Sequence, residues 1–299
     1  MDGIIPLWKP KGYTSHDCVM KIRKLLRTKK VGHTGTLDPD VEGVLPICVG
    51  QATKIVPFLT DTAKTYIAEL TLGTATDTED SSGEIIEEKP VNNSLTIEEI
   101  NVTLSGFLGV TKQVPPMYSA VKVNGKKLYE YARAGVTIER PVRSILIKEI
   151  ELLEHIDKRR FRFLVVCSKG TYIRTLCVDI GRALGYPAHM SHLIRTQTGS
   201  ISEQETVTFD EIEKMLDNKT AEKVFLPIQK GVEHLDALLV KDELIDKIYN
   251  GQKLPLPSNF NYTSPFRVQS NDTLLAIYEV NPKNSSEIKP VRVFQPESR

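Results

Sequence analysis

The sequence predicts an α+β protein with a mixed, mainly antiparallel sheet, followed by a small β-rich domain. Helical and strand patterns follow one another along the 299 residues without the regular strand–helix–strand repeat of a parallel sheet. After about Leu235 the composition changes, because Pro and Asn become frequent and only short strand patterns follow. Apolar residues make up 40% of the chain, which is enough to bury a sizeable core. We therefore expect a large domain over residues 1–235 and a small domain over residues 236–299.

The first elements follow from local patterns. The apolar segment IIPLW predicts a short strand, and Ser15 offers an N-cap for a helix. The apolar stripe from Val19 to Leu26 has helical spacing, so this helix should end near Arg27. The next expected elements are a glycine-punctuated loop at 32–43, a buried strand at 44–50, a short helix at 51–59, an alternating strand at 65–73, an acidic turn at 77–84 and a helix capped by Thr96 at 96–109.

An Asn-Gly hairpin signal in VKVNGKKL, residues 121–128, opens the second half of the large domain. It is followed by a helix at 128–135, a strand pair at 142–154 and 160–170, a helix with a glycine stop at 171–185 and an extended segment at 191–199. In the small domain we expect a short helix at 241–251 and strands at 266–270, 273–280 and 288–294.

The four cysteines do not suggest a metal site. Cys18, Cys48, Cys167 and Cys177 are widely scattered, with no C-x-x-C pair and no histidine at zinc-ligand spacing. Each stands beside valine, leucine or isoleucine, which is typical of a reduced residue in the core. We expect four free thiols and no bound metal.

The charges are unevenly distributed although the net charge is only +1. Residues 1–33 carry eight Lys/Arg against two acids, and residues 112–174 carry fourteen against six. Acidic residues gather at 77–99 and 203–243. Such segregation would give a basic face and an acidic face, which suits phosphate contacts, but uneven statistics on a solvated surface explain it equally well.

The sequence carries no sign of a membrane or export segment. No apolar run reaches the roughly eighteen residues of a membrane-spanning helix. The beginning, MDGIIPLWKPKG, lacks the long apolar stretch and small-residue cleavage site of a signal peptide. We expect a cytoplasmic protein.

The most informative stretch is residues 31–54, VGHTGTLDPDVEGVLPICVGQATK. Its three early glycines allow backbone conformations that other residues disfavour, and Pro39 fixes the chain directly after Asp38. A carboxylate on a rigid loop between a helix and a buried strand is placed like a catalytic group. An isolated Leu-Asp-Pro is more often a helix cap or a turn, so the loop alone leaves both interpretations open.

The whole stretch resembles the active-site segment of the B-type tRNA pseudouridine synthases, the TruB family. The resemblance rests on GHTGTLDP followed by GVLPICVG and ATK. It continues through LWKPKGYTSHDCV, KTYIAELTLGTATDTEDSSGE, QVPPMYSAVKVNGKKLYEYAR, SKGTYIRTL and HMSHLIRTQTG, about 230 residues in family order and spacing. One departure is the acidic pair Asp40 and Glu42, where many relatives carry less acidic residues.

The resemblance implies a pseudouridine synthase catalytic domain and a C-terminal PUA-like RNA-binding domain. Such an enzyme isomerises the uridine at position 55 of the tRNA T-loop by detaching uracil, rotating it and rejoining it through C5. It uses neither a metal nor a nucleotide cofactor. The partner would be the T-arm of tRNA, with no protein partner evident in the sequence, and the protein would act as a monomer.

The resemblance also assigns residues, with Asp38 as the catalytic carboxylate. It matches Arg174 to the arginine that pairs with this aspartate, and a guanidinium there should lower the carboxyl pKa. Tyr66 matches the tyrosine that stacks on the target base, although by itself it reads as a core strand residue. Tyr172 and Leu193 match further positions of the substrate pocket, where they would serve equally well in the core.

Other matched residues concern the RNA around the target base. A base stacked within the T-loop has to be extruded before the reaction. His33 matches the histidine associated with the space that the extruded nucleotides leave. The RNA backbone could be contacted by Lys9, Lys11, Lys29 and Lys30, although Lys9 could instead support the catalytic loop.

Two other hypotheses remain at this point. The first is a tRNA-binding protein that helps the tRNA elbow to fold, with catalysis secondary or lost. The presence of Asp38, Tyr66 and Arg174 disfavours that loss, and a folding role alongside catalysis stays open. The second is a related synthase that acts on another RNA, which the lack of long basic extensions disfavours.

Overall fold

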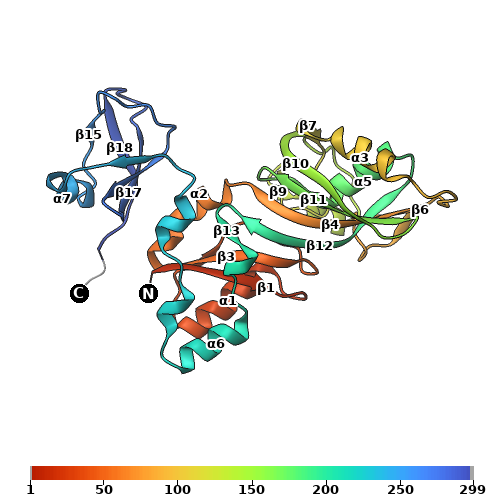
Figure 1. Ribbon diagram of the computed structural model, residues 1–299, viewed down its shortest axis with the longest axis horizontal. Coiled ribbons are helices and arrows are strands. Elements are labelled where there is room, and N and C mark those ends of the chain that lie inside the picture. Colours follow the sequence, from red (N-terminus) through yellow and green to blue (C-terminus); the bar gives the residue numbers. More distant parts are fainter. Residues whose placement is uncertain (1, 297–299) are drawn as a thin grey trace.

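The computed structural model describes residues 2–296 and is built on one large, curved, mainly antiparallel sheet (Figure 1). Its main path runs β1-β3-β12-β4-β11-β10-β7, with β2 paired to β3 and β13 paired to β12. Among the described strands of this sheet, only β12 and β3 pair in parallel, over two residues. The strands are β1 Gly3–Lys9, β2 Val31–His33, β3 Glu42–Val49, β4 Lys64–Leu72, β7 Gly109–Gln113, β10 Arg143–His155, β11 Arg160–Cys167, β12 Ala188–Thr198 and β13 Ile201–Ser202.

Helices cover two parts of this sheet. At the β1 end lie α1 Ser15–Leu26 and α6 Phe209–Asp217, and α3 Ile97–Ser105 and α5 Ile173–Ala183 pack at the far end (Figure 1). One buried core joins α1 residues such as Ile22 to sheet residues such as Ile47 and Phe163. The other elements of this part are short: α2 Val56–Thr60, β5 Thr74–Thr76, β6 Ile85–Glu88, β8 Lys122–Val123, β9 Lys126–Lys127 and α4 Leu128–Arg133.

Most expected elements are confirmed, and two details are wrong. The N-cap of α1 is Thr14, whose side chain accepts from the Asp17 amide, while Ser15 is buried in the first turn. The helix expected at 51–59 divides into a 3₁₀ turn, Gly50–Ile55, and α2. Pro57 explains the division, because it has no amide hydrogen for a helical bond and is tolerated only near a helix start. The four cysteines are buried free thiols, as predicted.

A five-stranded sheet of order β14-β16-β17-β18-β15 forms the C-terminal β-rich region, in keeping with a PUA-like domain (Figure 1). Its elements are β14 Ala237–Leu239, α7 Ile245–Tyr249, β15 Leu254–Pro255, β16 Phe266–Ser270, β17 Thr273–Val280 and β18 Glu287–Val293. Residues 236–299 remain the predicted small domain.

The C-terminal sheet is joined to the large sheet by a shared core and by a pair of hydrogen bonds from a glutamine side chain, called here a glutamine clasp. Ile277 and Phe294 are buried in one cluster with Ile4. Gln51 pairs both ends of its amide with the main chain of Gln295: Nε2 donates to the carbonyl at 2.9 Å and Oε1 accepts from the amide at 2.8 Å. The two sheets therefore form a continuous structure.

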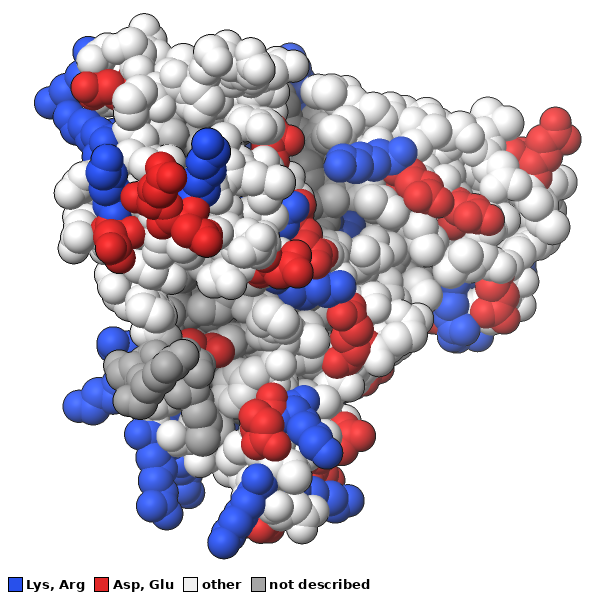
Figure 2. Space-filling view, turned by 60° about the vertical axis from the view of Figure 1, so that its left-hand side comes forward, with Lys and Arg blue, Asp and Glu red and all other residues white. Residues whose placement is uncertain are grey.

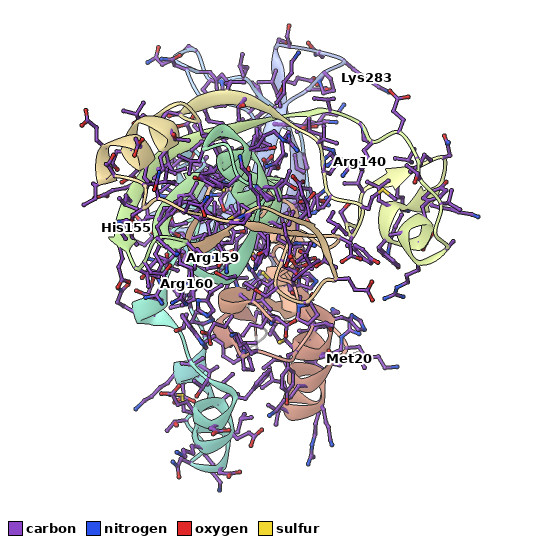
Figure 3. The ribbon with its side chains drawn as sticks, turned by 90° about the vertical axis from the view of Figure 1, so that its right-hand side faces the viewer. Met20, Arg140, His155, Arg159, Arg160 and Lys283 are labelled. Carbon is purple, nitrogen blue, oxygen red and sulfur yellow. The ribbon has the colours of Figure 1, made fainter. Side chains whose placement is uncertain are left out.

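The surface mixes charges of both signs. On the face shown in Figure 2, Lys and Arg side chains stand beside Asp and Glu side chains, so this face is not segregated by sign. At the far end of the sheet, Arg159 and Arg160 lie next to each other near the turn between β10 and β11 (Figure 3). Among residues 2–296, no helix is both long and apolar enough to cross a membrane.

Candidate active site

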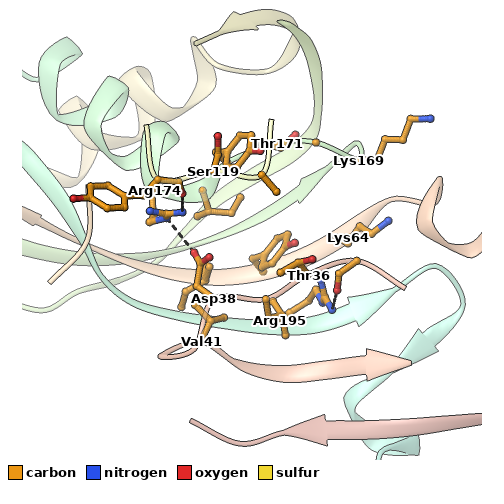
Figure 4. A pocket seen from close by; sticks show the side chains of 18 of the residues that line it. Thr36, Asp38, Val41, Lys64, Ser119, Lys169, Thr171, Arg174 and Arg195 are labelled. Atoms are coloured by element: carbon orange, nitrogen blue, oxygen red, sulfur yellow. Dashed lines mark hydrogen bonds and ion pairs between the residues drawn. The ribbon is translucent and has the colours of Figure 1, made fainter. Parts of the chain in front are cut away.

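A cavity of about 560 Å³ lies between loop 34–41, strands β4 and β12 and the start of α5 (Figure 4). Five residues predicted from the sequence line it: Asp38, Tyr66, Tyr172, Arg174 and Leu193. They come from four segments that are far apart in the sequence. The structure thus brings the predicted centre of the site together.

Loop 34–41 is held from beneath by buried polar groups. Lys9 is fully buried, and its Nζ donates to the carbonyls of Pro10, Pro39 and Val41, at 3.0, 3.1 and 2.5 Å. The Leu37 amide donates to Ser15 Oγ at 2.9 Å, which ties the loop to α1. Because these contacts fix the backbone on both sides of Asp38, the carboxylate has a defined position.

Arg174 holds the Asp38 carboxylate across the cavity. Its Nε lies 3.0 Å from Asp38 Oδ2, and Nη1 lies 3.7 Å from Asp80 Oδ2. Nη1 and Nη2 also donate to the main-chain carbonyls of Thr78 and Tyr118, each at 2.9 Å. The guanidinium therefore connects loop 34–41 to the acidic turn 77–84. Through Asp80 this turn helps to hold Arg174 in place, which the sequence did not predict.

Burial raises the pKa of the Asp38 carboxyl above its usual range, Arg174 lowers it, and the Asp80 carboxylate raises it further. The sequence predicted the opposite net direction, with Arg174 in control. Although 42% of the Asp38 side chain is accessible through the cavity, the protein around it removes enough water to outweigh the guanidinium. A raised pKa makes this carboxylate a stronger base than a free aspartate.

Tyr66 forms a wall of the cavity from β4, with its side chain almost wholly buried. Burial raises the pKa of its hydroxyl, and the neighbouring Arg195 lowers it. The group is therefore a neutral phenol at neutral pH. Leu193 is the residue of β12 paired with Ala68, two residues along the same face of β4. Together they give the cavity a flat, partly apolar side that suits a nucleobase.

Tyr172 is fixed by a second glutamine clasp. Gln113, buried at the end of β7, donates from Nε2 to the Tyr172 carbonyl at 3.0 Å and accepts from the Tyr172 amide at 2.8 Å. Tyr172 is the N-cap residue of α5, and no side chain caps this helix in the usual way. One turn on, Thr175 donates to Glu79 at 2.5 Å. These contacts lock the helix turn that carries Arg174.

Two further cations line the side of the cavity near β4 and β12, and the sequence did not predict either. Arg195 is 1% exposed and donates from Nε to the Val44 carbonyl at 2.8 Å and from Nη2 to the Gly35 carbonyl at 3.2 Å. Lys64 is 5% exposed and donates to two carbonyls of the segment before it, at 2.5 and 2.6 Å. Burial lowers the pKa of Lys64 to about 8, and Arg195 contributes.

The alternation of side chains along a strand could have predicted both Arg195 and Lys64 in the cavity. Residues two apart in a strand share a face. Leu193 and Tyr66 were predicted in the pocket, so Arg195 and Lys64 follow from them.

Gly43 makes the position of Arg195 possible. It has φ +123°, and a Cβ there would lie 2.2 Å from the Arg195 carbonyl oxygen. The two residues are partners in the parallel pairing of β3 with β12. Only glycine allows this backbone conformation together with such a close approach.

The remaining predicted residues lie outside the cavity lining. His33 is half-buried on β2, where burial and Arg195 lower its pKa, so its ring is neutral at neutral pH. Lys11, Lys29 and Lys30 are exposed. Lys9 cannot serve as a phosphate contact in this structure, because its ammonium group is buried and occupied by carbonyls. The alternative, support of the loop, fits its contacts.

The arrangement can carry out acid–base or nucleophilic chemistry on a flat, uncharged base. Asp38 supplies the carboxylate, Tyr66 a flat surface and Arg174 a fixed counter-charge. Among residues 2–296, no group of three or more His, Cys, Asp or Glu side chains is placed to hold a metal ion.

Two family models match the chain. The model described as "TruB family pseudouridylate synthase (N terminal domain)" matches residues 23–173, and "tRNA pseudouridylate synthase B C-terminal domain" matches residues 174–240. The protein named "tRNA pseudouridine synthase B" of Oceanobacillus iheyensis is 58% identical over 301 residues, covering 100% of this chain and 99% of that protein. The protein of the same name from Bacillus subtilis is 53% identical, again covering 100% and 99%.

Solved structures show the same fold. A chain of the "Structure of H/ACA RNP bound to a substrate RNA containing 2'-deoxyuridine" has a TM-score of 0.76 and 27% identity, covering 98% of this chain and 85% of that chain. A chain of the "Crystal Structure of a Cbf5-Nop10-Gar1 Complex" has a TM-score of 0.75 and 29% identity, covering 99% and 84%.

Proposed function

The chain belongs to the TruB family of pseudouridylate synthases and isomerises uridine to pseudouridine in tRNA, and from this premise we propose that its target is uridine 55 of the T-loop and its catalytic carboxylate Asp38. One observation carries the assignment of Asp38. It is the single carboxylate among the described residues that line the cavity, and it is paired with a buried arginine.

The reaction exchanges one bond of the ribose for another. The C1′–N1 bond breaks and its electron pair stays on uracil. Asp38 then either bonds to C1′ or takes the C2′ proton, and both routes need an ionised carboxylate. After the base has turned, C5 bonds to C1′. In the first route the bond between Asp38 and C1′ breaks in this step, and in the second route Asp38 returns its proton to C2′. The C5 proton then leaves and N1 takes up a proton. Atoms and charge balance without an external reactant.

The other cavity residues hold the base while it is detached. Tyr66 stacks against one face of uracil, and Leu193 and Tyr172 limit the space in which the base turns. Arg174 keeps Asp38 aimed at the sugar through the 3.0 Å ion pair. Since all of these groups are fixed before substrate arrives, little reorganisation is left for the chemical step.

The T-arm is bound around the mouth of the cavity. The target nucleotide has to leave its stack, and His33, half-buried beside the catalytic loop, is placed to contact the space that it vacates. The exposed Lys11, Lys29 and Lys30 contact backbone phosphates, and the PUA-like region binds a more distant part of the tRNA. The protein acts as a monomer on this substrate, and tRNA implies the cytoplasm as its compartment.

A role in folding the tRNA elbow accompanies catalysis in this proposal. To reach a stacked base, the enzyme has to open the T-loop, which closes again after release. An enzyme that binds the open form therefore also allows a misfolded tRNA to refold.

The test uses an unmodified tRNA transcript tritiated at C5 of uridine, with wild-type protein and Asp38→Asn. The expected result is tritium release by the wild type alone, mapped to the T-loop. Release mapped elsewhere would reject position 55. Equal release by Asp38→Asn would reject the role of Asp38. Retained tRNA binding without release by the wild type would favour the tRNA-folding protein instead.

A further inference from the structure

The cavity carries far more positive than negative charge. Of its described lining residues, Lys64, Arg133, Lys169, Arg174 and Arg195 are cations, and Asp38 is an anion. Arg174 is paired with Asp38 at 3.0 Å and Lys169 with Asp61 at 2.7 Å, while Arg133 is exposed to solvent. This leaves Lys64 and Arg195 as buried cations of the cavity.

Neither of these two buried cations has a carboxylate oxygen within 4.0 Å among residues 2–296. Main-chain carbonyls satisfy their hydrogen bonds but do not cancel their charges. A buried cation without an ion pair is costly, and proteins normally avoid it. A ligand that becomes negative next to these groups would explain why the fold keeps them.

The position of Arg195 is fixed before substrate binds. Its backbone is held against Gly43, and two of its three guanidinium nitrogens donate to carbonyls. The third, Nη1, donates to neither of these carbonyls and lies 3.5 Å from where a Cβ on Gly35, itself at the cavity wall, would be. The Arg195 side chain is also a hydrogen-bond partner of the Tyr66 hydroxyl. Figure 4 shows Arg195 across the cavity from Arg174.

Arg195 is also the partner of Tyr66 in the pairing of β12 with β4. Paired residues of neighbouring strands project from the same face of a sheet. Because the proposed function stacks uracil on Tyr66, the base comes to lie beside Arg195. That base carries the electron pair of the broken C1′–N1 bond and is therefore an anion until C5 attacks C1′.

We propose that Arg195, assisted by Lys64, stabilises the uracil anion while the base is detached from the ribose. This inference rests on the proposed function and adds a catalytic group to it. The charge is set in place by the fold and acts where negative charge develops, which is the arrangement that lowers a barrier most. A phosphate contact fits less well, because phosphates stay near the mouth with the exposed Arg133 and Lys169.

The first experiment measures single-turnover rates and tRNA dissociation constants for Arg195→Met and Arg195→Lys. Arg195→Met should lower the saturated rate about 10²–10³-fold, while tRNA affinity changes less than about threefold, because the interaction arises mainly in the transition state. Arg195→Lys should recover at least about tenfold of the rate, since it restores the charge. The matched control is Arg159→Met, which also removes an arginine bonded to a carbonyl but lies outside the cavity.

The second experiment replaces the target uridine by 5-fluorouridine and follows the disappearance of this nucleoside by chromatography. Because its C5 carries fluorine and has no proton to lose, the measured rate reports the detachment and rejoining of the base. Fluorine withdraws electrons, so detached 5-fluorouracil bears its negative charge more easily. The ratio of wild-type to Arg195→Met rates should therefore be smaller for 5-fluorouridine than for uridine. If Arg195→Met does not fold, Lys64→Met replaces it in the same comparison, with the same direction expected.

Three results would overturn the inference. The first is an unchanged saturated rate in Arg195→Met. The second is a ratio of wild-type to Arg195→Met rates that is equal for uridine and 5-fluorouridine. The third is weaker tRNA binding by Arg195→Met, with a salt dependence reduced by the equivalent of about one phosphate contact. Asp38→Asn is measured in parallel. If it loses activity while Arg195→Met keeps it, only this inference fails, and if Asp38→Asn stays active, the proposed function fails.

Discussion

Each side of the cavity contains a buried arginine, but one arginine is paired with carboxylates and the other is not. Arg174 faces two carboxylates, those of Asp38 and Asp80, at 3.0 and 3.7 Å. Arg195 has no carboxylate oxygen within 4.0 Å among residues 2–296 and donates instead to the carbonyls of Val44 and Gly35. The charge of Arg174 holds the Asp38 carboxylate in position, and the charge of Arg195 remains available to the substrate. Burial alone therefore does not tell what an arginine does, and the nature of its partners does.

Removing Arg174, the arginine that is paired with carboxylates, should have the largest effect. Arg174→Met leaves Asp38 and Asp80 without the guanidinium between them, so the proposed catalytic carboxylate, Asp38, loses its fixed position. We expect the single-turnover rate to fall about 10³-fold, or about 4 kcal/mol. Arg174→Lys should recover only part of this, because an ammonium group cannot reproduce the fork of contacts. A full recovery would mean that charge alone is required there.

Gly43→Ala should disturb the other side by displacing Arg195. The new Cβ would lie 2.2 Å from the Arg195 carbonyl oxygen, at φ +123°. We expect the free energy of unfolding, measured by urea denaturation, to drop by about 3 kcal/mol or more. Gly12→Ala is the matched control, because Gly12 has φ +83° and nothing within 4 Å of its Cβ position. Its loss should be about 1 kcal/mol, and equal losses would contradict the steric argument.

Lys9→Met tests the support beneath the loop. It leaves three main-chain carbonyls without their donor, so urea denaturation should show a loss of about 2 kcal/mol. Lys11→Met, two residues on and exposed, should change stability by less than about 0.5 kcal/mol. If Lys9→Met were as stable as the wild type but bound tRNA more weakly, Lys9 would have to be interpreted as a phosphate contact in spite of its burial.

The two glutamine clasps allow the cavity to be compared with the domain junction. Gln113→Ala frees the main chain of Tyr172 beside the cavity, whereas Gln51→Ala frees that of Gln295 far from it. We expect similar losses of stability, about 1 kcal/mol each. Only Gln113→Ala should lower the saturated rate, by about tenfold or 1.4 kcal/mol. A rate loss of the same size in Gln51→Ala would show that general destabilisation is the cause.

The smallest effect concerns the pH dependence of the rate. Both proposed routes need an ionised Asp38, so the single-turnover rate should fall as pH drops through its raised pKa. Asp80→Asn removes a negative neighbour that raises this pKa, so the acid limb of the profile should move to lower pH. Asp40→Asn should shift it in the same direction but less, since Asp40 contributes less to the rise. A shift to higher pH in Asp80→Asn would contradict this.

Features encoded by neighbouring residues could be predicted from the sequence. Thr96 caps its helix, and Asn124 and Gly125 adopt the positive φ of the hairpin turn, because both signals act within a few residues. The grouping of Asp38, Tyr66 and Arg174 came from resemblance rather than from local chemistry. The Ser15 cap was wrong by one residue because Thr14 and Ser15 are chemically equivalent as caps, and only packing decides between them.

Features set by distant partners could not be predicted. The net pKa shift of Asp38 depends on how much protein surrounds the cavity, which no motif records. Gln113 acts through Tyr172, 59 residues away, and Arg195 through Val44, 151 residues away. Lys9 carries the same charge as an RNA-contacting lysine, and only its burial shows that it binds carbonyls instead.

The shared core of the two sheets has a consequence for the order in which the protein can be completed during synthesis. Ile4 packs in one cluster with Phe294, which follows it by 290 residues along the chain. At about 5–20 residues per second, a ribosome needs roughly 15–60 s between them. Throughout that interval the cluster lacks one of its buried members, although Ile55, Ile201 and Val232 are made earlier. This cluster is therefore completed only after β18 and Phe294 have been made, and a premature stop codon that removes them would leave the region around Ile4 less well covered.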